Sequence, residues 1–286
     1  MKKKIVGLGE VLWDMLPDGK KLGGAPCNFA YHAAQVGDNE GWGVSAVGND
    51  ELGQEILDNL KEKGIKFIIP VIDKPTGTVK VTLDEKGVPN YEICKGVAWD
   101  YIPFTPDMEA LAKECDAVCF GALAQRNKES YDTIHKFLEA VPEKTLKVFD
   151  INLRQDFYSK EVIEKSLKIA NILKINDDEV AVIKDMFGMM DMSDEEALRK
   201  IKDEYGLQMV VETMGAVGSY VFADGETSWV PTPKVEVADT VGAGDSFTGA
   251  FISELLNGKS ISDAHKKAVE VSAFVCTRNG AMPSYK

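Results

Sequence analysis

Short apolar segments alternate with stretches of helical periodicity along most of the chain. The apolar segments show no consistently polar face, which is typical of strands in a parallel sheet that helices cover on both sides. They lie at residues 5–11, 41–48, 116–123, 146–152, 171–176 and 208–215. Two of the helical stretches, 28–37 and 51–64, end at a glycine, which commonly terminates a helix. The pattern predicts a doubly wound α/β domain that binds its ligand at the carboxyl ends of the strands.

A different pattern covers residues 67–99, where the sequence has no good helix. Apolar and polar residues alternate over 76–94, and residues 85–87 predict a turn between two strands. An antiparallel hairpin inserted in an α/β chain is either an elaboration of the sheet edge or a lid over the active site. We expect a small antiparallel lid formed by about 12–22 and 67–99. Because no linker or repeat interrupts the chain, we expect one domain that spans 1–286.

Composition and charge restrict the partners of this chain. It has 286 residues, of which 44% are hydrophobic, and this is enough for a sizeable core. Its 33 basic and 46 acidic residues give a net charge of −13 without an extended basic run, so we expect no nucleic-acid and no membrane partner. An anionic ligand must then be held by local devices such as a helix N-terminus, backbone amides or a metal ion.

The N-terminus and the cysteines indicate the compartment. Glu10 and Asp14 interrupt the apolar run that follows the basic start, so the pattern predicts neither a signal peptide nor a membrane-spanning segment. The five cysteines are scattered and lack histidines at metal-binding spacing. Reduced, mostly buried thiols are the simple interpretation, and we expect a cytoplasmic protein.

Residues 239–251, DTVGAGDSFTGAF, combine a glycine-rich turn with the start of a helix. Gly242, Ala243 and Gly244 let the backbone approach a ligand closely, and their amides would lie at the positive end of the helix dipole. Such a cradle holds a phosphoryl group without a basic side chain. It is not a Walker A loop, because no Gly-Lys-Ser/Thr follows, and it lies too near the C-terminus for a dinucleotide fingerprint.

Asp245 comes directly after this turn. An acidic residue in the first turn of a helix is often only a favourable partner for the helix dipole. A carboxylate beside a phosphate cradle has a second use, since it can accept the proton of an attacking hydroxyl during phosphoryl transfer. A simple helix cap does not need the glycine pair, so the sequence favours the catalytic interpretation.

Several motifs together resemble the ribokinase-like (PfkB) carbohydrate kinases. They are GGAPCNFAYHAAQVG, VGNDELG, NDDE, TMGAVGS, DTVGAGDSFTGAF and TRNGAMPS, and they occur in the order of that family and cover nearly the whole chain. The resemblance implies a three-layer α/β/α core with a mostly parallel sheet and a small β lid. It also implies transfer of the γ-phosphate of ATP to a primary hydroxyl of a sugar. GGAP and FDINLR look most like the fructokinases, so D-fructose is the expected acceptor.

The resemblance assigns roles to single residues of the sugar and phosphoryl sites. Asp245 is the implied base, and the amides of residues 242–244 form the implied anion hole. The implied sugar-binding residues are Asp14, Gly24 and Asn28, whose oxygen and amide groups suit a polyol. FDINLR adds Asn152 and Arg154; Arg154 binds a sugar hydroxyl or a phosphate, or else forms a surface salt bridge. Gln125 and Arg126 are further candidates of the same kind.

The nucleotide and metal sites also follow from the resemblance. Asn176 and Glu179 form an Asn-x-x-Glu pattern that would organise Mg²⁺ and the phosphate chain, although a helix capping box has the same spacing. The residues expected to approach the nucleotide are Thr213, Gly215 and Gly218, in a segment that could equally be a plain strand–turn–strand. Positions that hold a monovalent cation in relatives, such as K⁺, align with Asp239, Val241, Val275, Gly280 and Ser284.

Three functions stay open from the sequence. The first is a fructokinase-like enzyme that uses ATP and Mg²⁺. The second is a kinase of the same family that acts on ribose, a 2-keto-3-deoxy sugar acid, a nucleoside or an inositol. The third is a non-catalytic sugar-binding sensor, against which the presence of Asp245 and the glycine-rich turn argues. We also expect a homodimer formed through the lid, because a small sheet with one apolar face needs a cover.

Overall fold

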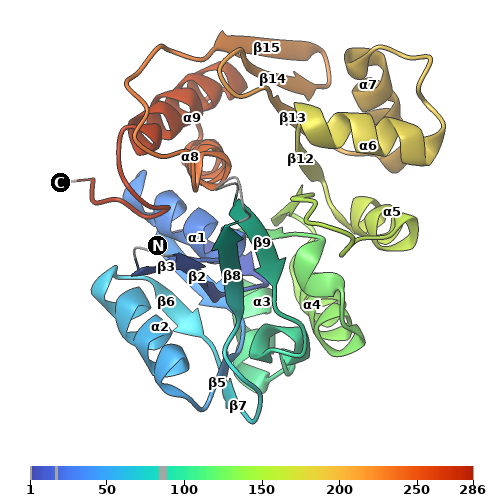
Figure 1. Ribbon diagram of the computed structural model, residues 1–286. Helices are drawn as coiled ribbons and strands as arrows, with labels where there is room; N and C mark the ends of the chain where they lie inside the picture. Colours follow the sequence, from blue (N-terminus) through green and yellow to red (C-terminus); the bar gives the residue numbers. More distant parts are fainter. Residues whose placement is uncertain (1, 17–18, 84–88, 286) are drawn as a thin grey trace.

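The computed structural model describes residues 2–16, 19–83 and 89–285 (Figure 1). The turn predicted at 85–87 lies outside the described residues. In the described part, a nine-stranded sheet has the order β15-β14-β13-β12-β11-β10-β1-β4-β6. Its strands are β1 Lys4–Leu8, β4 Glu40–Val44, β6 Lys66–Ile68, β10 Ala117–Phe120, β11 Leu146–Asp150, β12 Ile172–Asn176, β13 Met209–Thr213, β14 Gly218–Ala223 and β15 Glu226–Pro231. From β6 to β13 all neighbours are parallel, and β14 and β15 continue the sheet antiparallel.

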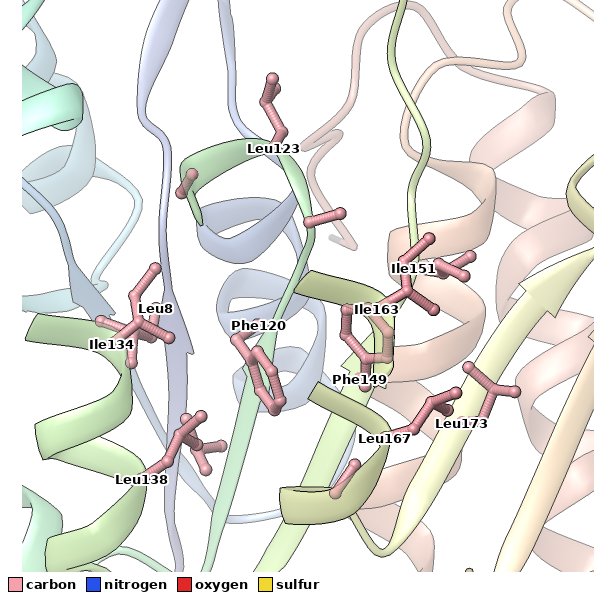
Figure 2. Packing of buried hydrophobic residues seen from close by; sticks show 14 of the residues in the cluster. Leu8, Phe120, Leu123, Ile134, Leu138, Phe149, Ile151, Ile163, Leu167 and Leu173 are labelled. Atoms are coloured by element: carbon pink, nitrogen blue, oxygen red, sulfur yellow. The ribbon is translucent and has the colours of Figure 1, made fainter. Parts of the chain in front are cut away.

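Helices cover both faces of this sheet, so the predicted three-layer fold is confirmed. They are α1 Ala25–Gln35, α2 Glu51–Glu62, α3 Pro106–Glu114, α4 Lys128–Ala140, α5 Lys160–Ile169, α6 Asp177–Phe187, α7 Asp194–Tyr205, α8 Ala243–Leu256 and α9 Ile261–Cys276, with short 3₁₀ turns at Ala98–Tyr101 and Leu123–Gln125. Helices α3 to α7 pack on one face, where Phe120 and Phe149 stack between the sheet and α4 and α5 (Figure 2). Helices α1, α8 and α9 pack on the other face.

Helix α1 lies unusually close to the sheet because glycines face it. A Cβ atom on Gly7 of β1 would lie 1.8 Å from the carbonyl oxygen of Pro26, and one on Gly41 of β4 would lie 2.1 Å from that of Ala30. Both positions therefore exclude any side chain. The close approach fixes the start of α1, and with it Asn28, at the carboxyl end of β1.

A small sheet stands outside the three layers. Its strands are β2 Leu12–Leu16, β3 Gly19–Gly23, β8 Thr78–Leu83 and β9 Pro89–Ile93 in the order β3-β2-β8-β9. The pairs β2–β3 and β8–β9 are antiparallel, whereas β2 and β8 run parallel.

The small sheet includes a shorter part of the chain than the range 67–99 that we expected for the lid. Lys66–Ile68 pairs in parallel with β4, because helix α2 completes a βαβ crossover back to the large sheet. The next strand, β7 Val71–Ile72, pairs with β5 Val47–Gly48. Closure of the small sheet over a sugar stays a prediction.

Arg126 joins the base of the small sheet to the core. Its Nε and Nη2 donate to the two carboxylate oxygens of Asp100 at 2.7 and 2.9 Å, and Nη2 also donates to the carbonyl of Cys94. The guanidinium carbon lies 4.0 Å from the ring centroid of Trp99. Arg126 thus points into the interior and does not line the active-site cavity. Gln125 is likewise buried against Gly121 and Ser166. Neither residue acts as the sugar-site candidate that the sequence suggested.

Among the residues described, no helix is both long and apolar enough to cross a membrane.

Replacing Arg126 by Met tests how much this buried pair stabilises the fold. The change leaves Asp100 buried without its cation, and breaking a buried pair in this way typically costs about 3–5 kcal/mol of unfolding free energy. Urea-induced unfolding at neutral pH measures the difference. Lys128→Met is the control, because it removes an exposed pair with Asp132 on α4 and is expected to change stability little. Equal losses in the two variants would contradict the assignment.

Candidate active site

One large cavity of about 890 Å³ opens at the carboxyl ends of the parallel strands. Its wall is built by the small sheet, the start of α1, the ends of β12 and β13, and the start of α8. A cavity of this size is large enough for two small ligands placed end to end. The doubly wound topology predicts a site at this edge, and the structure places it there.

The start of α8 forms the centre of the cavity wall. Gly242 caps the helix with a φ of 79°, and a Cβ atom there would lie 2.7 Å from the carbonyl oxygen of Ala281. Only glycine suits both constraints. The amide of Ala243 donates to the carbonyl of Thr240 at 3.2 Å, so the implied anion hole relies on the amides of Gly242 and Gly244.

Asp245 is half-buried in the first turn of α8. Its Oδ2 accepts a hydrogen bond from Nδ2 of Asn28 at 2.7 Å, across the floor of the cavity. Burial and the neighbouring carboxylate of Asp150 raise the pKa of Asp245 to about 6. The hydrogen bond from Asn28 and the cations Lys174 and Arg154 act to lower this pKa. A carboxyl with this pKa is ionised at neutral pH and still basic enough to take a proton.

Lys174 is a charged residue of the cavity wall that the sequence analysis missed. It lies on β12, only 7% exposed, with Nζ 3.4 Å from Oδ1 of Asp150. Burial acts to lower its pKa, but the carboxylates of Asp150, Glu179 and Asp245 raise it overall, so the ammonium stays charged. A Cβ on Gly244 would lie 3.1 Å from Nζ, which places this charge directly beneath the glycine turn.

The predicted sugar residues all line one end of the cavity; they are Asp14, Gly24, Asn28, Asn152 and Arg154. The loop after β11 presents Arg154 between two residues with positive φ, Asn152 at 44° and Gln155 at 49°. Such strain in residues other than glycine is often kept where a loop must aim a side chain. Among the described residues, the alternative of a surface salt bridge of Arg154 with Asp150 or Asp156 is not found, and Asp150 pairs with Lys174 instead.

The predicted nucleotide residues line the opposite end; they are Asn176, Thr213, Gly215 and Gly218. The segment around them is also the strand–turn–strand that the sequence allowed, because β13 and β14 pair antiparallel. The two interpretations are therefore compatible. Further polar groups that line this end and were not predicted are Ser219, Thr232, Lys234 and Ser272.

Asn176 and Glu179 form the capping box at the start of α6. The side chain of Asn176 accepts from the amide of Glu179 at 2.9 Å, and Oε2 of Glu179 accepts from the amide of Asn176 at 2.9 Å. Oε1 of Glu179 accepts from the amide of Leu153. Backbone groups thus occupy both carboxylate oxygens, while the adjacent Asp177 and Asp178 line the cavity. Within the described ranges, no cluster of three or more metal-binding side chains occurs.

Of the residues expected around a monovalent cation, Asp239 and Val241 lie on the loop before α8, Val275 lies near the end of α9, and Gly280 and Ser284 follow that helix. Asp239 accepts from the amides of Val241 and Gly280, both at 3.1 Å, and so joins the loops. Burial acts to raise the pKa of Asp239, but these hydrogen bonds and the cation Lys21 together lower it. The cation role of Asp239, Val241, Val275, Gly280 and Ser284 stays a prediction.

Comparisons with known proteins identify the family of this chain. The family model for pfkB family carbohydrate kinases matches residues 18–286. A fructokinase of Rhizobium leguminosarum bv. trifolii is 26% identical over 98% of this chain and 87% of its own length. An ATP-dependent 6-phosphofructokinase of Thermoanaerobacterium thermosaccharolyticum is 27% identical over 98% of this chain and 90% of its own length.

A solved structure shows the same fold. The fructokinase of Vibrio cholerae O395, in its form with fructose, ADP and a calcium ion bound, has a TM-score of 0.82 and 24% identity, and the match covers 99% of this chain and 95% of the other. The fold alone would leave the activity open. The family model covers nearly all of the chain, however, and this chain belongs to the pfkB family of carbohydrate kinases.

Proposed function

We propose that this kinase transfers the γ-phosphate of ATP to the primary hydroxyl of D-fructose, giving fructose 6-phosphate, with Asp245 as the base. The observation that carries the proposal is the half-buried carboxylate of Asp245 at the glycine-rich start of α8, held by Asn28. A cavity with sugar-binding groups at one end and nucleotide-binding groups at the other brings the two substrates together at this point.

The reaction needs one proton transfer and one substitution at phosphorus. The sugar hydroxyl gives its proton to Asp245, its oxygen forms a bond to the γ-phosphorus, and the bond from that phosphorus to the β-phosphate oxygen breaks to release ADP. The amides of Gly242 and Gly244 and the ammonium of Lys174 offset the charge of the moving group. Phosphoryl transfer relies on such positioning and charge stabilisation more than on covalent catalysis.

Mg²⁺ is part of the proposal. Bound to ATP, it would neutralise phosphate charge and align the phosphate chain. Asp177 and Asp178 offer oxygen ligands at the cavity wall, and Asn176 lines the same wall. Glu179, whose oxygens are engaged by backbone amides, fixes the start of α6 and so acts on the metal indirectly. We place the K⁺ site at the loops that Asp239 joins.

The charges at the sugar end favour an uncharged acceptor. Asp14 and Asp245 line the cavity, and their carboxylates would repel a sugar acid or a sugar phosphate. Arg154 is the exposed cation there, and one cation does not outweigh two carboxylates. Fructose in the related Vibrio structure and the name of the Rhizobium relative support a neutral ketohexose. We also propose that the small sheet closes over the sugar and joins two copies as a homodimer in the cytoplasm.

Asp245→Asn tests the base. The variant keeps the shape and the contact with Asn28 but cannot accept the proton, so kcat is expected to fall by about 10²–10⁴-fold. Binding of fructose and ATP, measured by calorimetry, is expected to survive. Asp203→Asn on α7, an exposed position remote from the cavity, is the control and should keep full activity. Near-normal turnover of a folded Asp245→Asn protein would remove Asp245 from this role.

A panel of acceptors tests the substrate. With Mg-ATP, kcat/KM for D-fructose is expected to exceed that for fructose 6-phosphate, ribose, a 2-keto-3-deoxy sugar acid and adenosine, because the acidic sugar end disfavours anions and its polar groups match a polyol. ADP release measures each rate, and a chelator added to the best pair should abolish it. An acceptor tenfold better than fructose, about 1.4 kcal/mol of transition-state preference, would overturn the fructose assignment while the kinase assignment stands.

A further inference from the structure

A second acidic side chain, Glu10, reaches the catalytic centre from the end of β1 and takes no part in the chemistry proposed above. Glu10 is 3% exposed. On one side it lines the large cavity together with Asn28 and Asp245. On the other side it lines a cavity of about 10 Å³ that it shares with Asp150 and Asn152. Its carboxyl therefore stands between the reaction space and the interior behind it.

The carboxyl of Glu10 is only partly satisfied. The backbone amides of Glu10 itself and of Ala25 donate toward it, but Oε2 is buried without a hydrogen-bond partner. In the described segments no cation lies within ion-pair distance of Glu10, and Arg154 acts on it only from the exposed side of the cavity. A buried carboxylate without a counter-ion is costly, and such a group is normally neutralised by a proton.

Asp150 presents a second unsatisfied acceptor to the same small cavity. Its Oδ1 accepts no hydrogen bond, although Nζ of Lys174 lies 3.4 Å away. Two carboxylate oxygens are both acceptors and cannot form a hydrogen bond with each other. A proton on one of them and a water molecule between them supply the missing donors. The small cavity has about the volume that one water needs, and three polar side chains, Glu10, Asp150 and Asn152, line it among apolar neighbours. Since Asp150 has the cation Lys174 and Glu10 has none, the proton belongs on Glu10.

The surrounding charges act in the same direction. Asp245 of α8, Arg154 after β11 and Cys27 of α1 face Glu10. Asp150 of β11 and Cys119 of β10 lie across the small cavity. Asp14 of β2 and Lys174 of β12 line the wall of the large cavity. Burial and Asp245 raise the pKa of Glu10 to about 7, although the backbone amides and Arg154 act to lower it. A bound triphosphate would add negative charge and raise it further.

We propose that Glu10 holds a proton during turnover and, through one water in the small cavity, makes a hydrogen bond to Asp150, so that no second negative charge stands beside Asp245. Glu10 is then a positioning residue: in its neutral form it adds no negative charge near the transferred phosphoryl group. Loss of its proton would place a like charge next to the base and the phosphates. The proposal rests on the role of Asp245 given above.

The first test is spectroscopic and does not require activity. A difference infrared spectrum between the wild type and Glu10→Gln is expected to contain the C=O band of a protonated carboxyl, which disappears as the pH rises through about 7. Glu212→Gln is the matched control: Glu212 is equally buried, its pKa is raised to about 7 by burial and nearby acids, and it does not line either cavity. The carboxyl band of Glu212 should be lost in Glu212→Gln and stay in Glu10→Gln. Absence of a Glu10 band at pH 6 overturns the proposal.

The second test is the alkaline side of the pH profile. For the wild type and Glu212→Gln, kcat/KM with fructose should fall about tenfold between about pH 7 and pH 9, because Glu10 loses its proton. Glu10→Gln mimics the protonated form, so it should keep activity within about tenfold at pH 6.5 and show no such fall. An unchanged alkaline fall in Glu10→Gln overturns the proposal. If the wild type phosphorylates no acceptor, the proposed function fails, while the infrared spectrum still decides the protonation of Glu10.

Discussion

The proposed site needs Asp245 to stay negatively charged in a poorly hydrated place that must also accept the negative charge of a phosphate. Burial alone would neutralise the carboxyl, because an ionised group loses its hydration in the interior. Asn28 donates a hydrogen bond to it, and Lys174 and Arg154 supply positive charge, so the pKa of Asp245 settles at about 6. The start of α8 and its glycine turn then offer amides rather than further acids to the incoming phosphate.

The fold brings these groups together from distant parts of the chain. Asn28 reaches Asp245 because glycines in β1 and β4 allow α1 to lie close to the sheet. Lys174 and Asp150 come from neighbouring parallel strands, so their pair forms at the same carboxyl edge. The arrangement gives a strongly acidic chain a place for an anionic ligand, because positive charge is concentrated at one place in the cavity instead of being spread over the surface.

Much of this architecture could be predicted from the chain. The parallel strands and their helices follow from apolar segments and glycine stops, and the glycine-rich start of α8 is a local pattern that needs no tertiary information. The extent of the small sheet could not be predicted, because Lys66–Ile68 is short and joins β4 only through the crossover of α2. Arg126 was misjudged for a similar reason, since its partner Asp100 is distant in sequence and their pairing exists only in the fold.

Lys174 and Glu10 were missed although each leaves a trace in the sequence. Lys174 is a single cation within the buried strand 172–176, and Glu10 is a single acid within the apolar segment 5–11. A charged residue in such a place is expensive unless it is paired or functional. What the sequence cannot show is which strands are neighbours, and hence that both residues lie at the same end of the sheet as Asp245.

The most direct test of the central claim is the acidic side of the pH profile of kcat/KM for fructose. Because burial raises the pKa of Asp245 and only the ionised form accepts a proton, activity should be full above that pKa and fall tenfold per unit as the pH drops below about 6. A profile that stays flat down to about pH 5, or that bends only near 4 as for an ordinary aspartate, would contradict the claim that the carboxylate of Asp245 is the base.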